Sequence, residues 1–108
     1  MTVSELLQHG FKEVALPDPE REIDGVYIGD LLSWVMGRAQ ADNAWITIMS
    51  NINVIAVATL ADTAVVILSE DVELPGDIVQ QAVAKGINVV RTEKPSYEAA
   101  IALYELLK

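Results

Sequence analysis

Hydrophobic residues fall into short runs that are separated by polar or glycine-containing breaks along most of the chain. Residues 26–28, 44–49 and 64–68 are apolar at nearly every position, a pattern that indicates strands buried on both faces of a sheet. Residues 30–38 and 51–62, which lie between these runs, have the length and composition of helices. Strands that alternate with helices predict an α/β fold, a three-layer sandwich with a mainly parallel sheet.

Turn and capping residues mark the remaining elements. The tetrapeptide Thr2–Glu5 has the pattern of a capping box and predicts a short helix that ends at Gly10, followed by a short strand over residues 12–16. Residues 17–24 are charged or contain proline and predict a surface loop. Further along, the sequence predicts a helix over 75–86, a strand over 87–91 and a helix from Pro95 or Ser96 to Leu107. We expect one domain, 1–108, in which residues 1–25 precede an α/β core over 26–108.

The segment 52–61 is apolar on almost every side. A helix of this composition is covered on two sides, so the sequence predicts that it forms a subunit interface. Its branched residues leave a strand over 52–59 as the alternative. The predicted interface residues are Ile52, Ile55, Ala56, Val57 and Leu60.

Composition and charge narrow the range of partners. Sixteen acidic and seven basic residues give a net charge of −9, which disfavours binding to nucleic acid and to anionic membranes. Asn43–Ala61 has no charged residue but contains five polar side chains among residues 47–59, so we expect a buried strand and helix rather than a membrane span. The start of the chain lacks a signal-peptide pattern and cysteine is absent, which favours a location in the cytoplasm.

An apolar fraction of 52% in so short a chain predicts a homodimer or a partner-bound subunit.

Aromatic and histidine residues do not form a recognisable site in the sequence. Trp34 and Trp45 fall on predicted apolar faces, which favours packing in the core or in an interface. Tyr97 and Tyr104 share one face of the last predicted helix and are expected to pack against the sheet. His9, the only histidine, is expected at the surface.

The loops that follow parallel strands form the expected functional edge. In such sheets, strands end and helices begin on the same side, where backbone N–H groups can bind a ligand. The alternative is that the polar residues there are ordinary helix caps, and the acidic ones a solvated rim rather than a divalent-cation site. The candidate ligand-binding residues are Gly29, Asp30, Ser50, Asn51, Ser69, Arg91 and Thr92.

The sequence carries no motif for catalysis. It has no cysteine, no histidine cluster and no glycine-rich phosphate loop, so we expect no catalytic residues, no metal site and no cofactor. A small acid–base or metal-assisted enzyme that uses Asp30, Glu70 or Asp71 is the weakest alternative.

The run ITIMSNINVIAVATLADTAVVILSEDVELPGDIVQQAVAKGINVVRT resembles the DRTGG domain family, and the resemblance extends from Val26 to Lys108. That family is similar to the N-terminal domain of HPr kinase/phosphorylase and, more distantly, to the N-terminal domains of Mur ligases. The family's Gly-Asp-Arg and Thr-Gly-Gly turns are replaced here by Ser50–Ile52 and Leu68–Glu70. The kinase chemistry of HPr kinase belongs to a separate domain with a phosphate loop that this chain lacks, so the resemblance does not predict a serine kinase.

The resemblance implies a regulatory, dimer-forming or ligand-sensing module, found alone or attached to an enzyme. We therefore expect a non-catalytic regulatory or assembly module that forms a homodimer, with an enzyme as its partner. The alternative is a sensor of a nucleotide or a nucleotide-like metabolite that binds at the strand-end loops.

Overall fold

The structure is a computed structural model that describes residues 1–108. A five-stranded sheet in the order β1-β5-β4-β3-β2 forms its centre. Strands β2 to β5 are parallel to one another, and β1 runs antiparallel to β5 at one edge. The strands are β1 (Lys12–Ala15), β2 (Val26–Ile28), β3 (Ala44–Thr47), β4 (Val65–Leu68) and β5 (Val89–Arg91).

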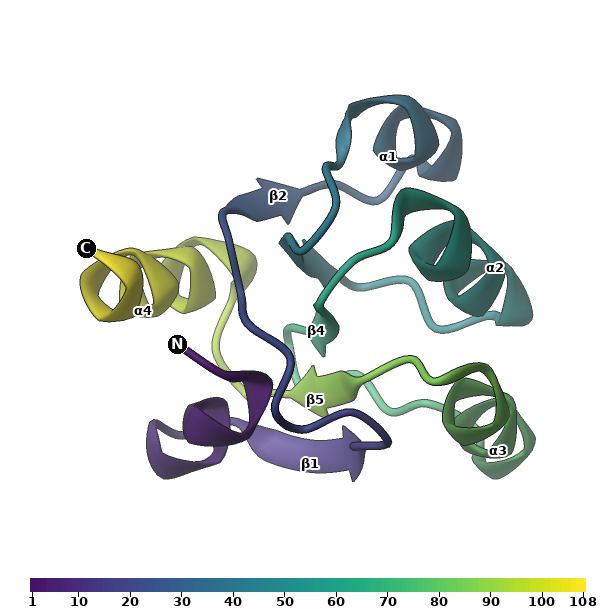
Figure 1. Cartoon of the computed structure of the whole chain (residues 1–108), viewed down its shortest axis with the longest axis horizontal. Coiled ribbons are helices and arrows are strands. Elements are labelled where there is room, and N and C mark those ends of the chain that lie inside the picture. The colour runs from purple at the N-terminus through teal and green to yellow at the C-terminus, as the bar shows by residue number, and fades with distance from the viewer.

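Helices cover both faces of the sheet, as the sequence predicted (Figure 1). Helices α1 (Leu32–Arg38), α2 (Ile52–Ala61) and α3 (Gly76–Lys85) lie on one face. Helix α4 (Ser96–Leu107) and the 3₁₀ helix η1 (Val3–Gln8) lie on the other. The three-layer sandwich with a mainly parallel sheet is therefore confirmed.

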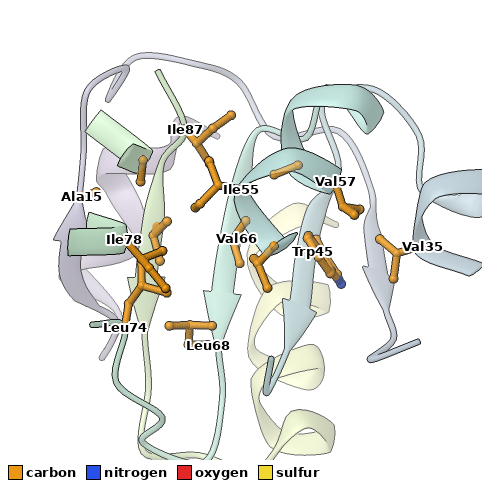
Figure 2. Close-up of a cluster of buried hydrophobic side chains, with 14 of the residues drawn as sticks. Ala15, Val35, Trp45, Ile55, Val57, Val66, Leu68, Leu74, Ile78 and Ile87 are labelled. Carbon is orange, nitrogen blue, oxygen red and sulfur yellow. The ribbon is translucent and has the colours of Figure 1, made fainter. Parts of the chain in front are cut away.

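Each face of the sheet contributes to its own hydrophobic core, because neighbouring residues of a strand point to opposite sides. Trp45, Val66 and Leu68 face α1–α3, and Figure 2 shows them packed against side chains such as Val57 and Ile78. The residues between them face η1 and α4, where Ile46 and Ile67 are fully buried. This double burial explains why the strands appear in the sequence as continuous apolar runs.

The predicted elements agree with the structure except at a few ends. The segment 52–61 is helical rather than extended, and Asn51 caps it, since its Oδ1 accepts a hydrogen bond from Asn53 N at 2.9 Å. The helix expected from Asp30 begins instead at Leu32, with Leu31 at its N-cap. The predicted helix near the start of the chain is a 3₁₀ helix, and Glu5 accepts a hydrogen bond from Thr2 N in the expected capping arrangement.

The aromatic residues divide between core and surface. Trp45 is fully buried, as predicted, and Trp34 lies half-exposed on α1 with the Arg38 guanidinium 3.8 Å from its ring centroid. The prediction that Tyr97 and Tyr104 pack against the sheet is wrong, since they are 74% and 66% exposed. The side of α4 that faces the sheet carries Ala99 and Leu103 instead, both fully buried.

No helix of the chain is both long enough and apolar enough to cross a lipid bilayer.

Candidate functional site

The carboxyl ends of β2–β5 bring the predicted ligand-binding residues to one edge of the sheet. Since these four strands are parallel neighbours, their following loops form a row rather than a ring around one cavity. Gly29 and Asp30 follow β2, whereas Ser50 and Asn51 lie between β3 and α2. Ser69 follows β4, Arg91 ends β5 and Thr92 follows it.

Gly29 and Asp30 fasten the turn after β2 to β3. The Asp30 carboxylate accepts hydrogen bonds from Thr47 Oγ1 at 2.8 Å and from Ile48 N at 2.9 Å. The Gly29 carbonyl accepts a hydrogen bond from Trp45 Nε1 at 2.9 Å. A Cβ atom on Gly29 would lie 2.9 Å from the Tyr27 ring, so glycine at this position makes room for that ring. These contacts explain both residues without a ligand.

The loops after β4 and β5 occupy the place where open α/β sheets commonly bind ligands. The loop after β4 leads to α3 on one face, and the loop after β5 leads to α4 on the other (Figure 1). Where neighbouring loops diverge in this way, a crevice opens between the strand ends. The topology therefore puts the switch point next to Ser69 and Thr92.

Hydrogen bonds within the chain close this crevice. The Glu70 amide donates to the Lys94 carbonyl at 2.9 Å, and the Asp71 amide donates to the Thr92 carbonyl at 2.8 Å. Glu70 and Asp71 adopt positive φ angles of 59° and 58°, the left-handed conformation that non-glycine residues seldom adopt. The backbone amides that a phosphate would need at this point are thus already bonded across the two loops.

The side chains at the same switch point are also paired. The hydroxyl groups of Ser69 and Ser96 lie 2.7 Å apart, joining β4 to the first turn of α4. Arg91 Nη1 donates to Glu73 Oε1 at 3.0 Å, so a carboxylate of this chain already neutralises its charge. Thr92 is buried, and its hydroxyl oxygen accepts a hydrogen bond from the Lys94 amide at 3.2 Å.

A shallow polar depression remains open beside Ser50 and Asn51. It has a volume of about 710 Å³ and lies between the first turns of α2 and α3. Ser50 and Asn51 line this space, and Asn51 Oδ1 is occupied by its capping bond, which leaves the Asn51 amide nitrogen and the half-buried Ser50 hydroxyl available to a ligand. Asp77 and Gln81 of α3 line the opposite side, so the depression combines neutral hydrogen-bonding groups with one negative charge.

The acidic residues of this edge do not converge. No three aspartate, glutamate or histidine side chains lie close enough together to hold a metal ion. The alternative of a metal-assisted enzyme that uses Asp30, Glu70 or Asp71 therefore gains no geometric support.

The predicted interface on α2 is split between the core and the surface. Ile55 and Val57 are 2% and 3% exposed and belong to the core beneath α2, where they contribute to protomer stability (Figure 2). Ile52, Ala56 and Leu60 lie on the outer side of the helix and are exposed. Of the five residues predicted for an interface, these three present side chains that a partner could contact.

An apolar groove that was not predicted from the sequence lies between β2 and α4. We call it the β2–α4 groove; it has a volume of about 670 Å³ and only one charged residue, Lys108, on its lining. Tyr97 and Tyr104 lie seven residues apart and therefore on one side of α4. This spacing is the signal in the sequence that could have identified the groove, but that side of α4 was predicted to face the sheet. Its apolar lining consists of Val26, Ile28, Tyr97, Ala100, Ile101, Tyr104 and Leu107.

Comparison with known proteins identifies a structural likeness only. No protein-family model and no characterised protein sequence matches the chain. Among solved structures, the fold is similar to the regulatory region of the Clostridium perfringens pyrophosphatase, which comprises CBS and DRTGG domains in complex with the activator diadenosine tetraphosphate. The TM-score is 0.69 at 12% sequence identity, over 93% of this chain and 43% of that one.

At that identity the likeness concerns the fold, and this chain spans less than half the length of the pyrophosphatase regulatory region. The predicted resemblance to DRTGG domains is supported at the level of fold, whereas the link to HPr kinase stays a prediction. The chain thus has a DRTGG-like α/β fold.

Proposed function

We propose that the chain is a regulatory or assembly module that acts as a homodimer and has no catalytic site of its own. One observation supports this function above all: the exposed apolar side chains gather at one end of the sheet. Of the eleven large hydrophobic residues that are exposed, seven belong to the β2–α4 groove or to α1 with its N-cap, and α1 lies at the β2 end on the opposite face (Figure 1). The seven are Ile28, Leu31, Trp34, Met36, Tyr97, Ile101 and Tyr104.

The edge at the carboxyl ends of β2–β5, which we call the strand-end edge, supports the same proposal because it lacks the open polar groups of a catalytic site. The backbone amides of Glu70 and Asp71 are bonded within the chain, as are the side chains of Asp30 and Ser69, and the acidic groups of this edge do not converge. An apolar surface of this kind is typical of a protein–protein contact, whereas a catalytic site needs convergent polar groups. The fold likeness to a regulatory region agrees with such a role, and the module would act on an enzyme that it binds or is joined to.

The proposal is tested by measuring the mass of the protein in solution. Sedimentation equilibrium between 1 and 500 µM should reveal a dimer with a dissociation constant inside this range. A protein that stays monomeric throughout would contradict the homodimeric function. Addition of diadenosine tetraphosphate or ATP is not expected to be needed for association.

Sensing of a small molecule is the second function that a specific observation favours. The depression beside Ser50 and Asn51 offers unoccupied hydrogen-bonding groups near two helix N-termini, and the pyrophosphatase regulatory region was solved with a nucleotide activator. Thermal unfolding with AMP, ATP, diadenosine tetraphosphate and UDP-glucose, each with and without Mg²⁺, would test it. A ligand at 100 times its dissociation constant should add about 2.7 kcal/mol of stability. Ser50→Ala should reduce the shift, whereas no shift with any nucleotide would exclude this panel of ligands.

A further inference from the structure

The two edges of the sheet differ in how they are protected. At one edge, β1 carries the charged residues Lys12 and Glu13, and its pairing with β5 is interrupted by a bulge between Glu13 and Ala15. Charges and bulges are the usual means by which an edge strand avoids pairing with another chain. The opposite edge strand, β2, has the sequence Val-Tyr-Ile and pairs with β3 in an unbroken register. The edge formed by β2 is therefore open to strand pairing.

The hydrogen-bonding groups on the free side of β2 belong to two residues. The Gly25 carbonyl accepts from Ala44 N at 3.0 Å, and the Gly29 amide donates to the Ile46 carbonyl at 3.2 Å. Because groups on one side of a strand recur at every second residue, the backbone of Tyr27 also faces β3. The N–H and C=O groups of Val26 and Ile28 consequently point away from the sheet.

We propose that a second copy of this chain pairs with β2 in antiparallel orientation, so that the dimer contains one continuous ten-stranded sheet; this inference rests on the homodimeric function proposed above. A two-fold axis beside Tyr27 places Val26 of one copy opposite Ile28 of the other. Each such pair exchanges two hydrogen bonds, so the pairing satisfies all four outward-facing groups of each strand. The two tyrosines then form the non-hydrogen-bonded pair at the centre.

Helix α4 fits the same arrangement. It packs over β2 and β3, so its axis lies about half a strand spacing inside β2. With strands about 4.8 Å apart, the axes of the two α4 helices would be about 10 Å apart, the usual distance for packed helices. The stripe Tyr97, Ala100, Tyr104 and Leu107 would then lie at the contact between antiparallel helices. Tyr97 of each copy would face Tyr104 of the other, with the small Ala100 between them.

Charge favours this surface for contact between two acidic molecules. The chain has a net charge of −9, so most approaches of one copy to another bring like charges together. The β2–α4 groove contains no acidic residue and one lysine. A standard interface needs about 800 Å² from each partner. Exposed apolar side chains of the groove and of α1, which lies at the same edge on the opposite face, would both take part in such a contact, which is a part of a total surface of 5517 Å².

Two glutamate substitutions, at side chains of nearly equal exposure on different helices, test whether the β2–α4 groove forms the dimer contact. Tyr104, at 66% exposure, lies in the groove, whereas Leu60, at 69% exposure, lies on the outer side of α2 and belongs to the interface that the sequence predicts. Tyr104→Glu should raise the dimer dissociation constant at least about 100-fold, because symmetry places two unpaired charges in the contact. Leu60→Glu adds the same charge on the outer side of α2 and should change the dimer dissociation constant less than about threefold. Circular dichroism and melting temperature establish that both variants are folded.

Amide hydrogen exchange tests the strand pairing itself. In the dimer, the Val26 and Ile28 amides should be protected in proportion to the dimer population, whereas the Tyr27 amide, bonded to β3, should be protected at every concentration. Dissociation by Leu60→Glu but not by Tyr104→Glu would overturn the inference and leave the homodimeric function intact. Free exchange of Val26 and Ile28 in a dimer would overturn the continuous sheet. A wild-type protein that never associates would contradict both proposals.

Discussion

At the scale of single residues, Asn43 and Asn88 hold the connection between β1 and β2 against the amino ends of the strands. Asn88 Nδ2 donates to the Asp18 and Ala64 carbonyls at 2.8 and 3.0 Å, and its Oδ1 accepts from Asp18 N. Asn43 Nδ2 donates to the Asp24 carbonyl at 2.8 Å. The charged segment that the sequence predicts as a surface loop is thus bonded at both of its ends.

Arg21 fastens the middle of the same connection. Its guanidinium donates to Asp42 Oδ1 and to Asp62 Oδ1, both at 2.9 Å, and Asp42 and Asp62 have positive φ angles. Burial alone would lower the pKa of Arg21, but hydrogen bonds to Asp62 and Asp42 outweigh it and raise the pKa. Since the folded-state pKa is raised, the stabilisation is fully present below the ordinary pKa of arginine. It is lost only as the pH rises through the raised value, far above neutrality.

We expect Arg21→Lys to lower the free energy of unfolding by about 1–2 kcal/mol, because lysine cannot reproduce the forked contacts. Arg38→Lys is the matched control, since Arg38 is exposed and stacks on Trp34; it should cost less than about 0.5 kcal/mol. Urea unfolding at pH 7 measures both values. Equal losses in the two variants would show that Arg21 is no more than a surface residue.

At Thr63, in contrast to Arg21, we expect a substitution that raises the free energy of unfolding. Its Oγ1 is buried and has no hydrogen-bond partner. Thr63→Val keeps the shape of the side chain and removes the unpaired hydroxyl, so the free energy of unfolding should rise by about 1 kcal/mol. Thr47→Val removes a hydroxyl that donates to Asp30 and should lower it by about 1–3 kcal/mol. A larger loss from Thr63→Val than from Thr47→Val in urea unfolding would contradict this assignment.

The residue types of the strand-end edge could be predicted from the sequence, but their partners could not. The capping role of Asn51 is local, since its partner Asn53 is two residues away, and the sequence suggested it. Asp30 bonds Thr47 and Ser69 meets Ser96, contacts that depend on the arrangement of the strands. A ligand-binding residue and a residue that joins two loops therefore have the same appearance in the sequence.

At the scale of elements, α2 shows why periodicity could not separate the buried side of a helix from its exposed side. Apolar residues occur on both its buried and its exposed sides, so the sequence pattern did not reveal which side faces the sheet. The structure separates Ile55, which is in the core, from Leu60, which is at the surface. The order of the strands in the sheet was also not predicted from the sequence. Because β2, β3, β4 and β5 are neighbours in that order and their crossovers have the same hand, α1, α2 and α3 lie on the same face.

We expect Ile55→Ala to lower the free energy of unfolding by about 2–4 kcal/mol, because it leaves a cavity in the core. Leu60→Ala should change it by less than about 0.5 kcal/mol. Thermal or urea unfolding at a concentration where the protein is monomeric separates these effects from association. A large destabilisation by Leu60→Ala under these conditions would mean that the outer side of α2 packs within the protomer.

At the scale of the whole molecule, the net charge of −9 predicts how association responds to salt. Two acidic copies repel each other, and salt screens this repulsion within a Debye length that shortens as ionic strength rises. The dimer dissociation constant should therefore fall several-fold between 20 and 300 mM NaCl. Sedimentation equilibrium at both salt concentrations measures the change. A constant that rises with salt would indicate an interface held by ion pairs, which the uncharged β2 strand does not offer.

The position of β1 also has a consequence for the folding pathway. Strands β2, β3 and β4 each pair with the next strand along the chain, whereas Lys12 of β1 pairs with Arg91 of β5. Closing that long loop has the greater entropic penalty, so the β2–β5 unit should form before residues 1–24 attach. Truncating Leu6 to alanine should then accelerate unfolding and leave the refolding rate nearly unchanged, whereas Val66→Ala should slow refolding. Stopped-flow kinetics in urea would show β1 as the last strand to join and the first to leave.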